Sequence, residues 1–411
     1  MSIVNVDCEN LDKNPRCAHG PTLKFSRLVK GDVKVFFACS AYRDRKDCPF
    51  FLWEGEKITS SKELALQEWK QKFIPAIDHD SISLRLKEFE QLKCKHKHFC
   101  LSCFNFVFPS EYNNHKSHEL ITVNSNSELK HPSKFLFPLT KSKGEAQFWF
   151  SDTTLNFIHT NIKKTKADKI ICIGTPTLHE KLVSTSTKSI LLDIDHRYHW
   201  FYDAKRFIWF NMFNFHFMAD NEKSLSILID FLKDGSITVV IDPPFGARTE
   251  PLSKTIRQLE EYAQRSLSVF LILPYFMEPQ IDLSFPNFVM LDFPVEYTNH
   301  KKFKSNKQNA KPSPVRIFTN VNPKDFEFPV NEGYHYCEKC NAWRSKLNKH
   351  CDLCKTCPSK NGASYKHCSI CHICVKQTWK HCNTCNACCL IDHNCKRKGN
   401  FYPDKKKKIK H

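Results

Sequence analysis

The sequence predicts a doubly wound, Rossmann-like α/β domain flanked by small zinc-binding modules, and two observations support this class. From about residue 121 to 330, short apolar runs alternate with segments of helical periodicity, which is typical of βαβ units. The 21 cysteines avoid that stretch: four precede residue 50, three lie between residues 94 and 103, thirteen lie between 337 and 395, and Cys172 stands alone. Thiols gathered on both sides of a domain favour metal-binding modules over disulfides.

We expect seven strands in the central domain. In chain order they are residues 169–173, 189–194, 207–212, 237–241, 269–273, 289–293 and 315–319. Their near-continuous apolar runs suit strands that helices cover on both faces, and the last two suggest a terminal hairpin pair. Such a sheet binds its ligands beyond the carboxyl ends of its strands.

The other segments differ in composition from the central domain. We predict disorder for 1–15, a compact aromatic-rich module at 16–58, a helical linker at 59–93, a short finger at 94–120, the α/β domain at 121–330, a Cys/His-rich module at 331–396 and a basic tail at 397–411. Spaced apolar residues in the linker, such as Leu64, Trp69 and Phe73, favour a helix.

Hydropathy and charge exclude several classes of protein. No apolar run approaches the roughly 20 residues that a membrane helix needs, and the N-terminus lacks the basic and apolar regions of a signal peptide. We therefore expect a protein of the cell interior. The formal net charge of +19 favours a polyanionic partner. Residues 396–411 hold eight Lys and Arg, a run that suits either a solvated tail or a nuclear or nucleolar address.

The most informative motif is Asp242-Pro243-Pro244-Phe245, directly after the apolar run 237–241. It resembles the D/N-P-P-Y/F/W motif of amino-group methyltransferases, which implies S-adenosyl-L-methionine as the cofactor. An exocyclic adenine amine is a poor nucleophile because its lone pair is delocalised. Asp242 and the carbonyl of Pro243 can accept its two N–H bonds, and Phe245 can stack on a base withdrawn from its helix. The alternative is a Pro-Pro turn without chemistry.

Three loops after the first three expected strands are candidate cofactor contacts. In this fold class the first loop binds the methionine end of the cofactor, and an acid in the second accepts the ribose hydroxyls. The third loop is a candidate adenine rim. The candidates are Gly174, Thr175 and Pro176 in the first loop, Asp193, Asp195 and Arg197 in the second, and Asn211 and Asn214 in the third. Ordinary loop packing is the alternative for each.

The module at 16–58 has four residues at zinc-ligand spacing: Cys17, His19, Cys39 and Cys48. It resembles the GRF zinc finger, a class that binds nucleic acid. Its aromatic and basic residues suit stacking on bases plus phosphate contacts. They are Phe36, Phe50 and Trp53 beside Arg43, Arg45 and Lys46. The aromatic side chains could instead be the core of the module; we expect Phe50 to be core and the basic residues to be exposed.

The short finger at 94–120 carries the pattern C-x2-C-x11-H-x2-H in Cys100, Cys103, His115 and His118. This is close to the Cys2His2 zinc pattern, with a shorter spacing between the histidines. A lone finger of this kind favours a structural role over reading of a nucleic-acid groove. Cys94 is left over as a spare thiol.

The C-terminal block contains the repeat HC-x2-C-x2-C, which begins at His350, His367 and His381. It resembles CTCHY-type zinc modules. The candidate ligands are Cys337, Cys340, His350, Cys351, Cys354, Cys357, His367, Cys368, Cys371, Cys374, His381, Cys382, Cys385, Cys388, His393 and Cys395. These twelve Cys and four His suffice for four tetrahedral zinc ions, about six in the whole chain, and their spacing leaves the pairing open.

The order of these modules resembles the zinc finger CCHC domain-containing protein 4 family of ribosomal RNA N6-adenosine methyltransferases. The match covers residues 16–395 and includes RCAHGPTL, RDRKDCPFF and IDPPFG. The resemblance implies a seven-stranded class I methyltransferase domain, an adenosine of large-subunit ribosomal RNA as target, ribosomal RNA or pre-ribosomal particles as partners, and a place in nucleus, nucleolus and cytoplasm. The family's final CCHC knuckle is missing after Cys395, and the basic tail is a candidate replacement for its RNA contacts.

Three other functions remain open at this point. The first is N6-adenine methylation of DNA, which sequence separates poorly from methylation of RNA. The second is methylation of a protein glutamine amide, against which Asp242 and the basic charge argue, because the glutamine enzymes favour N-P-P-Y. The third is an RNA-binding scaffold without catalysis: the intact D-P-P-F argues against it, and the single glycine of the cofactor loop, Gly174, argues for it.

Overall fold

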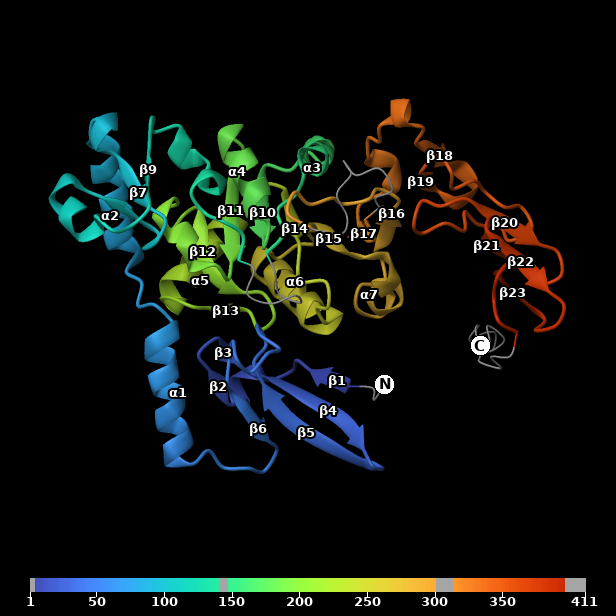
Figure 1. The fold of residues 1–411 in the computed structure, drawn as a ribbon, viewed down its shortest axis with the longest axis horizontal. Coiled ribbons are helices and arrows are strands. Elements are labelled where there is room, and N and C mark those ends of the chain that lie inside the picture. Colours follow the sequence, from blue (N-terminus) through green and yellow to red (C-terminus); the bar gives the residue numbers. More distant parts are fainter. Residues whose placement is uncertain (1–3, 140–146, 301–312, 396–411) are drawn as a thin grey trace. The chain divides into compact units, whose positions relative to one another are not determined.

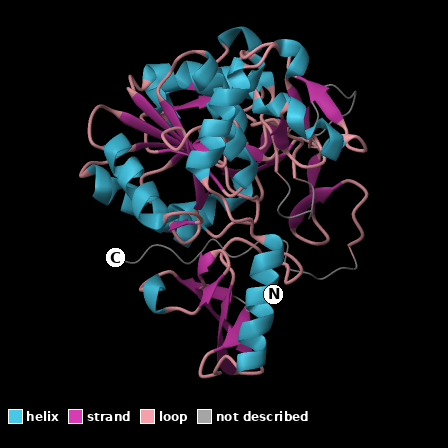
Figure 2. Cartoon of the chain, turned by 90° about the vertical axis from the view of Figure 1, so that its left-hand side faces the viewer, coloured by secondary structure: helices cyan, strands magenta, loops and turns pink. Residues whose placement is uncertain are grey.

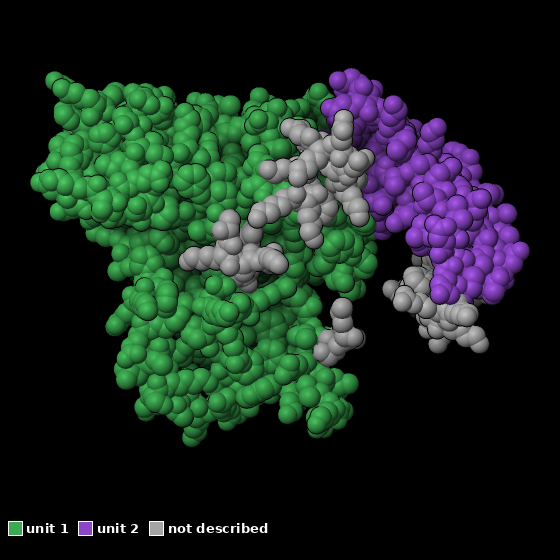
Figure 3. Space-filling model, in the orientation of Figure 1, with its two compact units in different colours: residues 1–290, 294–327 green, residues 291–293, 328–411 purple. Residues whose placement is uncertain are grey.

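The computed structural model describes residues 4–139, 147–300 and 313–395, so the basic tail at 397–411 lies outside the described residues. The chain divides into two compact units (Figure 3), one of Met1–Met290 with Pro294–Glu327 and one of Leu291–Phe293 with Phe328–His411. The first unit holds the α/β domain and both N-terminal fingers, and the second holds the Cys/His-rich module. Within the described residues, no helix is both long enough and apolar enough for a membrane span.

A mixed eight-stranded sheet forms the centre of the first unit (Figure 1). Its strands are β10 (Lys169–Ile173), β11 (Ser189–Asp193), β12 (Phe207–Asn211), β13 (His216–Phe217), β14 (Ile237–Ile241), β15 (Ser268–Pro274), β16 (Val289–Leu291) and β17 (Val315–Thr319). They stand in the order β13-β12-β11-β10-β14-β15-β17-β16. The strands from β12 to β15 are parallel, whereas β13 and β17 pair antiparallel with β12 and β15. The chain order reverses between β10 and β14, which is where doubly wound sheets bind ligands.

The sheet has one strand more than the seven we expected. The addition is β13, whose two residues, His216 and Phe217, pair with the end of β12. A strand of two residues is too short to show an alternating pattern in the sequence. The edge strand β16 ends at Leu291, two residues before the expected end, and the next residue, Asp292, accepts hydrogen bonds from Ser345 and Asn348 of the second unit.

Helices cover both faces of the sheet (Figures 1 and 2). One face carries α3 (Asp152–Lys164) and α4 (Pro176–Ser184), and the other carries α5 (Asn221–Leu232), α6 (Thr249–Ala263) and α7 (Glu278–Ser284). Ile171 and Ile173 of β10 pack in one buried cluster with Leu252 and Ile256 of α6. Residues two apart share one face of a strand, and residues four apart share one face of a helix. Cys172 between them is buried as well, so the strand is covered on both faces.

The N-terminal module is a four-stranded antiparallel sheet in the order β1-β4-β5-β6. Its strands are β1 (Val4–Asp7), β4 (Leu23–Val29), β5 (Asp32–Ala38) and β6 (Phe51–Trp53), and a short pair, β2 (Arg16–Cys17) and β3 (Gly20–Pro21), lies beside them. The prediction that residues 1–15 are disordered is wrong for the part that the structure describes, because Val4–Asp7 form the strand β1. Arg248 and Lys254 donate hydrogen bonds to the carbonyls of Val4 and Cys8, and no local pattern reveals partners that far along the chain.

The linker consists of two helices, α1 (Ser60–Phe73) and α2 (His79–Gln91). The finger that follows is a three-stranded sheet of β7 (His98–Cys100), β8 (Asn105–Val107) and β9 (Leu120–Thr122). Its buried Phe99 lies with its ring centroid 5.4 Å from those of both Phe135 and Phe201. The second finger therefore shares its hydrophobic core with the α/β domain.

The second unit is built from three antiparallel hairpins. They are β18 (His335–Cys337) with β19 (Ala342–Arg344), β20 (Tyr365–Cys368) with β21 (Ile373–Lys376), and β22 (Trp379–Cys382) with β23 (Ala387–Leu390). The buried Asp292 ties its first segment to the hairpins. One carboxylate oxygen accepts hydrogen bonds from the backbone and hydroxyl of Ser345, both at 3.0 Å, and from the amide of Asn348 at 2.9 Å.

Candidate active site and metal centres

A cavity of about 280 Å³ lies at the carboxyl ends of β10, β11, β12 and β14. Doubly wound sheets bind their ligands in this position. Four parts of the chain form its described walls: the D-P-P-F motif, two of the predicted cofactor loops with the end of β12, a loop of the first zinc finger, and Leu139 with Gln147 and Phe148.

Asp242 directly follows β14 and is held from both sides. Its backbone N–H donates to the carbonyl of Ile173 on β10 at 3.1 Å, and its carboxyl group accepts a hydrogen bond from the Tyr297 hydroxyl at 2.9 Å. Burial raises the pKa of Asp242 well above its usual range, although the Tyr297 hydrogen bond lowers it. Burial also raises the pKa of Tyr297, so its hydroxyl keeps the proton that it donates.

The other three motif residues, Pro243, Pro244 and Phe245, also line the cavity. The Phe245 ring lies almost parallel to that of Phe148, with centroids 5.2 Å apart and an angle of 7° between the planes. Tyr297 lies 5.7 Å from the same ring. The motif therefore presents a polar acceptor, Asp242, beside a flat aromatic surface.

Tyr297 and Phe148 are two residues of the site that were not predicted from the sequence. Tyr297 lies 55 residues after Asp242, its hydrogen-bond partner, and stands in no repeated spacing with it. The sequence offers one weak signal, an aromatic cluster around Phe148 and Phe150 in the run QFWF.

Gly174 fits the tight approach that a cofactor loop needs. Its φ is +64°, and a Cβ there would lie 3.0 Å from both the Asp242 carbonyl oxygen and the Met212 side chain. A glycine is required because the loops after β10 and β14 pass so closely. Gly174 lines the cavity, so a loop with this one glycine still makes the tight turn at the cavity wall.

Asp193, the last residue of β11, is a buried carboxyl group on the cavity wall. Burial, together with the neighbouring charge of Asp195, raises the pKa of Asp193 to about 7. Asp195 also lines the cavity, but the Arg197 guanidinium occupies its carboxylate through bonds of 2.9 and 2.7 Å. Of the two acids, Asp193 therefore fits ribose hydroxyls better, and as a hydrogen-bond acceptor on this wall it fits S-adenosyl-L-methionine.

Four predicted cofactor contacts are placed elsewhere. Among the described residues that line the cavity, none is Thr175, Pro176, Arg197 or Asn214. Thr175 and Pro176 begin helix α4, and Arg197 donates to Asp195 and to the Phe137 carbonyl. These residues hold the loops in position rather than face the cavity.

Asn211 and Asn214 instead attach the first zinc finger to the α/β domain. Asn214 donates to the carbonyls of His19 and Pro21 at 3.0 and 2.8 Å, and it is not among the described residues that line the cavity. Asn211 does line the cavity, and it also donates to the His19 carbonyl at 2.9 Å and to the Ser40 hydroxyl at 2.8 Å. Sequence could not suggest these contacts, because about 190 residues separate the partners.

The first finger consequently forms part of the cavity wall. Ala41, Tyr42, Arg43 and Asp47, all on the loop between β5 and β6, line the cavity. The sequence predicted this loop as an exposed RNA contact and gave no sign that it reaches the active site.

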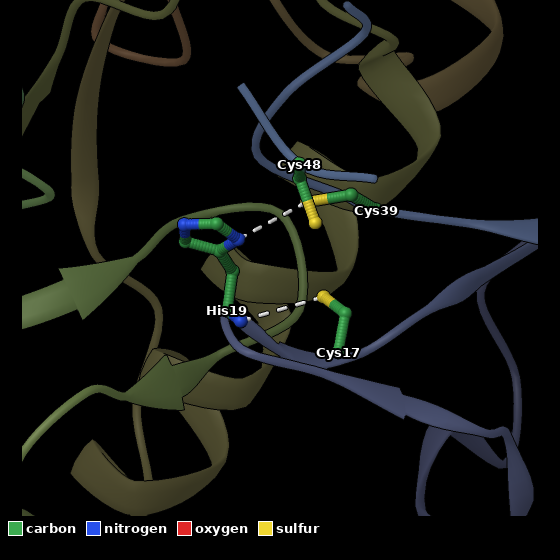
Figure 4. A group of neighbouring side chains, drawn as sticks. All are labelled: Cys17, His19, Cys39 and Cys48. Atoms are coloured by element: carbon green, nitrogen blue, oxygen red, sulfur yellow. Dashed lines mark hydrogen bonds between the residues drawn. The ribbon is translucent and has the colours of Figure 1, made fainter. Parts of the chain in front are cut away.

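The four predicted ligands of the first finger, Cys17, His19, Cys39 and Cys48, converge (Figure 4). Their ligand atoms all lie within 4.8 Å of one another, and Cys39 Sγ is 3.5 Å from His19 Nδ1. A tetrahedral zinc with bonds of about 2.0–2.3 Å places its ligand atoms roughly 3.3–3.8 Å apart. The site therefore fits zinc.

The second finger gathers Cys100, Cys103, His115 and His118 in the same way. Cys103 Sγ lies 3.2 Å from His118 Nδ1, and the two histidine Nδ1 atoms are 3.2 Å apart. His115 ends the 3₁₀ segment Pro109–His115, and the turn that follows brings His118 back to it, with the His118 N–H donating to the His115 carbonyl at 2.9 Å. Cys94 is exposed and is not part of the group.

The C-terminal ligands are paired across the repeats rather than within them. Three groups converge: Cys337, Cys340, His350 and Cys357; Cys351, Cys354, His367 and Cys374; and Cys368, Cys371, His381 and Cys388. The first and last ligands of each HC-x2-C-x2-C repeat thus belong to one group, and its two middle cysteines belong to the next. The distances fit tetrahedral zinc, for example 3.7 Å between Cys371 and Cys388 sulfurs.

The last part of the block continues this pattern. His393 Nε2 lies 3.1 Å from Cys385 Sγ and 2.9 Å from Cys395 Sγ, and Cys382 Sγ lies 3.6 Å from Cys395 Sγ. Cys389, which is not among the predicted ligands, lies 3.8 Å from Cys385, so it borders this group.

Comparisons with known proteins agree with this site. Residues 141–322 match the family described as "Probable N6-adenine methyltransferase". The chain is 39% identical to the Homo sapiens rRNA N(6)-adenosine-methyltransferase ZCCHC4 over 402 residues, which is 93% of this chain and 78% of that protein. The Mus musculus protein of that name is 39% identical over 82% of this chain and 70% of its own length. For the Xenopus tropicalis protein the identity is 38%, over 84% and 74%. The chain therefore belongs to the rRNA N(6)-adenosine-methyltransferase ZCCHC4 family.

Proposed function

We propose that this enzyme uses S-adenosyl-L-methionine to methylate the N6 amine of an adenosine in large-subunit ribosomal RNA. The observation that carries the proposal is that Asp242-Pro243-Pro244-Phe245 lines one cavity together with the predicted cofactor contacts Gly174 and Asp193. The names of the relatives support ribosomal RNA as the substrate.

The residues of the motif hold the amine for attack. Asp242 and the Pro243 carbonyl accept hydrogen bonds from its two N–H groups. These two hydrogen bonds turn the nitrogen lone pair towards the methyl group that is transferred. When bound, the cofactor supplies that methyl group as an electrophile. Tyr297 fixes the orientation of the Asp242 carboxyl group through its 2.9 Å hydrogen bond.

The aromatic surface holds the base. Phe245 offers a face for adenine, and the nearly parallel ring of Phe148 supports it from behind. Stacking of this kind contributes roughly 1–3 kcal/mol per base, which offsets the cost of withdrawing the base from its helix.

One face of the first finger supports binding of the RNA strand. Phe25, Phe36 and Phe51 stack in a row with centroids 5.3 and 5.2 Å apart. Arg27 lies 5.7 Å from the Phe36 ring, and Arg45 lies 4.1 Å from the Phe51 ring. Aromatic rings interleaved with cations suit bases and phosphates together. Phe50, 2% exposed, is core as expected, so it does not belong to this face.

The zinc modules are proposed to hold six ions, one in each N-terminal finger and four in the C-terminal block. Convergent Cys/His groups at tetrahedral spacing support this count. We also propose pre-ribosomal particles as partners, and a place in nucleus, nucleolus and cytoplasm. The basic run at 396–411 and the net charge of +19 support these two proposals.

Asp242→Ala tests the function directly. Purified wild-type and variant proteins are incubated with cofactor and ribosomal RNA, and the nucleosides are measured by mass spectrometry. N6-methyladenosine should form with the wild type and fall at least about 100-fold with the variant, the low end for losing a positioned catalytic group. RNA affinity should change little, because Asp242 is proposed to contact the amine of one base inside the cavity and no phosphate.

Two outcomes would reject parts of this assignment. Normal methylation by Asp242→Ala would remove Asp242 from the mechanism. A wild-type enzyme that methylates a DNA duplex of the same sequence but not the RNA would move the substrate from RNA to DNA.

A further inference from the structure

We propose that Arg43 on the first zinc finger is the phosphate-binding residue of the active site. It binds the backbone phosphate beside the target adenosine while the base lies at the D-P-P-F motif. This inference rests on the proposed function and adds a contact to it that the motif does not contain.

The charges of the cavity show why such a residue is needed. Among the described residues that line it, Arg43 is the one cation, and it shares the cavity with four acids, Asp47, Asp193, Asp195 and Asp242. RNA carries a negative phosphate at every nucleotide, and acids that are ionised repel it. A base can reach the motif with less repulsion if its phosphate meets a cation at the cavity.

Arg43 lies on the side of the cavity where the target base is expected. A Cβ at Gly246 would be 2.6 Å from Arg43 Nη1 and 3.2 Å from its Cζ, so the guanidinium lies directly against this glycine. Gly246 follows Phe245, the ring proposed to stack on adenine. The predicted cofactor contacts Gly174 and Asp193 come from other strands, β10 and β11.

The finger holds Arg43 in place. Its loop runs between two metal-ligand candidates, Cys39 and Cys48. The Asp44 carbonyl accepts from the N–H groups of Asp47 and Cys48 at 3.0 and 3.2 Å, which closes the loop into a turn. A cation on a loop fixed at both ends loses less conformational entropy on binding than one on a free loop.

The neighbouring basic residues have different surroundings. Arg45 lies over the Phe51 ring at 4.1 Å, on the aromatic face of the finger. Neither Arg45 nor Lys46 lines the cavity among its described residues. The three basic residues that the sequence grouped together therefore divide: Arg43 serves one phosphate at the active site, and Arg45 serves the strand as a whole.

Arg43→Ala and Arg43→Lys test the contact, with Lys205→Ala as the charge-matched control. Lys205 is exposed and precedes the amino end of β12, whereas the cavity lies at the carboxyl end of that strand. Cofactor affinity is measured by calorimetry, and kcat and KM are measured on a synthetic RNA that contains the mapped target adenosine. Arg43→Ala should lower kcat/KM about 10- to 100-fold, as expected for one charged hydrogen-bonding group.

The other measurements distinguish an RNA phosphate from the carboxylate of the cofactor as the anion that Arg43 binds. Arg43→Lys should recover part of the rate, Lys205→Ala should match the wild type, and cofactor affinity should stay within about twofold in all three. A large loss of cofactor affinity in Arg43→Ala would overturn the proposal, because the bound anion would then be the cofactor's carboxylate.

Gly246→Ala gives a second route to the same residue. The new methyl group would displace the flexible tip of Arg43 rather than backbone, so the fold should tolerate it. Gly246→Ala should lower kcat/KM in the wild-type background and add little in the Arg43→Ala background. Fully additive losses would show that the two positions act independently and would count against the contact.

A further experiment removes the negative charge of the RNA phosphate instead of the positive charge of Arg43. A neutral methylphosphonate replaces the phosphate on one side or the other of the target adenosine. At one of these positions the wild type should lose about 10- to 100-fold in kcat/KM, and Arg43→Ala should lose little more. Equal further losses in both proteins would overturn the Arg43 assignment alone. Absence of methylation of the unmodified RNA by the wild type would instead overturn the proposed function.

Discussion

The N-terminal and C-terminal zinc modules use the same types of ligand residue, Cys and His, in different arrangements. Each N-terminal finger forms one group of four ligands, and the first finger is bonded to the α/β domain through the His19 carbonyl, which accepts from Asn211 and Asn214. In the C-terminal block, each repeat contributes ligands to two successive groups. The comparison teaches that a zinc site can position one wall of an active site or link neighbouring hairpins, and that its neighbours, not its ligands, decide which.

The largest expected effect is a loss of cofactor affinity when the first zinc finger, but not the C-terminal block, loses a ligand. Cys39→Ser should release the first zinc, and metal binding in such sites supplies about 10–16 kcal/mol of folding energy. The finger loop would then no longer form the cavity wall, and Asn211, a predicted cofactor contact that lines the cavity, would lose its hydrogen bond to the His19 carbonyl. We expect cofactor affinity, measured by calorimetry, to fall at least about 100-fold, or about 2.7 kcal/mol.

Cys371→Ser is the matched variant in the other module. It also removes one cysteine ligand, but from a group in the second unit. Its cofactor affinity should remain within about twofold of the wild type. Equal losses in Cys39→Ser and Cys371→Ser would mean that the first finger has no special role at the cavity.

The parts of this site that sequence could predict are local in the chain. The D-P-P-F motif is four adjacent residues, and Gly174 follows an apolar run that is a recognisable strand. Both lie in the cavity where the fold class places ligands. The adjacent residues constrain each other strongly enough for a pattern to show.

The parts that sequence could not predict are contacts between distant segments. Tyr297 reaches Asp242 across 55 residues, and Asn211 reaches His19 across 192. Nothing in the spacing of these residues records that they meet. The C-terminal pairing was open for another reason: its candidate ligands are chemically interchangeable, and the geometry of the hairpins decides which four converge.

A smaller effect concerns the pH dependence of cofactor binding, which should be a property of the first unit alone. The pKa of Asp193 is raised to about 7, and ribose hydroxyls donate to the ionised form. Cofactor affinity should therefore rise as the pH rises through about 7 and then level off, with about a tenfold loss at pH 6. Calorimetry from about pH 5.5 to about pH 8.5, a range that spans this pKa, would measure the change in affinity.

Two variants serve as controls for this titration. Asp193→Asn should give weaker binding that does not vary with pH in this range, and Cys371→Ser should reproduce the wild-type curve. The sign for stability is the opposite. Because the folded protein holds the Asp193 proton up to about pH 7, the free energy of unfolding should decrease as the pH rises from about 4 to 7. A wild-type affinity that is independent of pH would exclude Asp193 as the ribose acceptor.

The smallest effect is a difference in zinc content, and it tests whether the C-terminal groups depend on one another. The hairpin β20–β21 carries His367 and Cys374 of one group and Cys368 of the next. Loss of zinc from the group that contains Cys371 would free one side of this hairpin and loosen the ligands it supplies to its neighbour.

Elemental analysis of protein purified without chelator should find about six zinc ions in the wild type. Cys17→Ser should lose about one, because the first finger shares no ligand with another group, whereas Cys371→Ser should lose about two or more. Cys389→Ser should lose none, since the neighbouring group has four other ligands in Cys382, Cys385 and His393 with Cys395. A loss of one ion in both ligand variants would show that the C-terminal groups are as independent as the N-terminal fingers. The difference between the modules would then lie only in what each contacts.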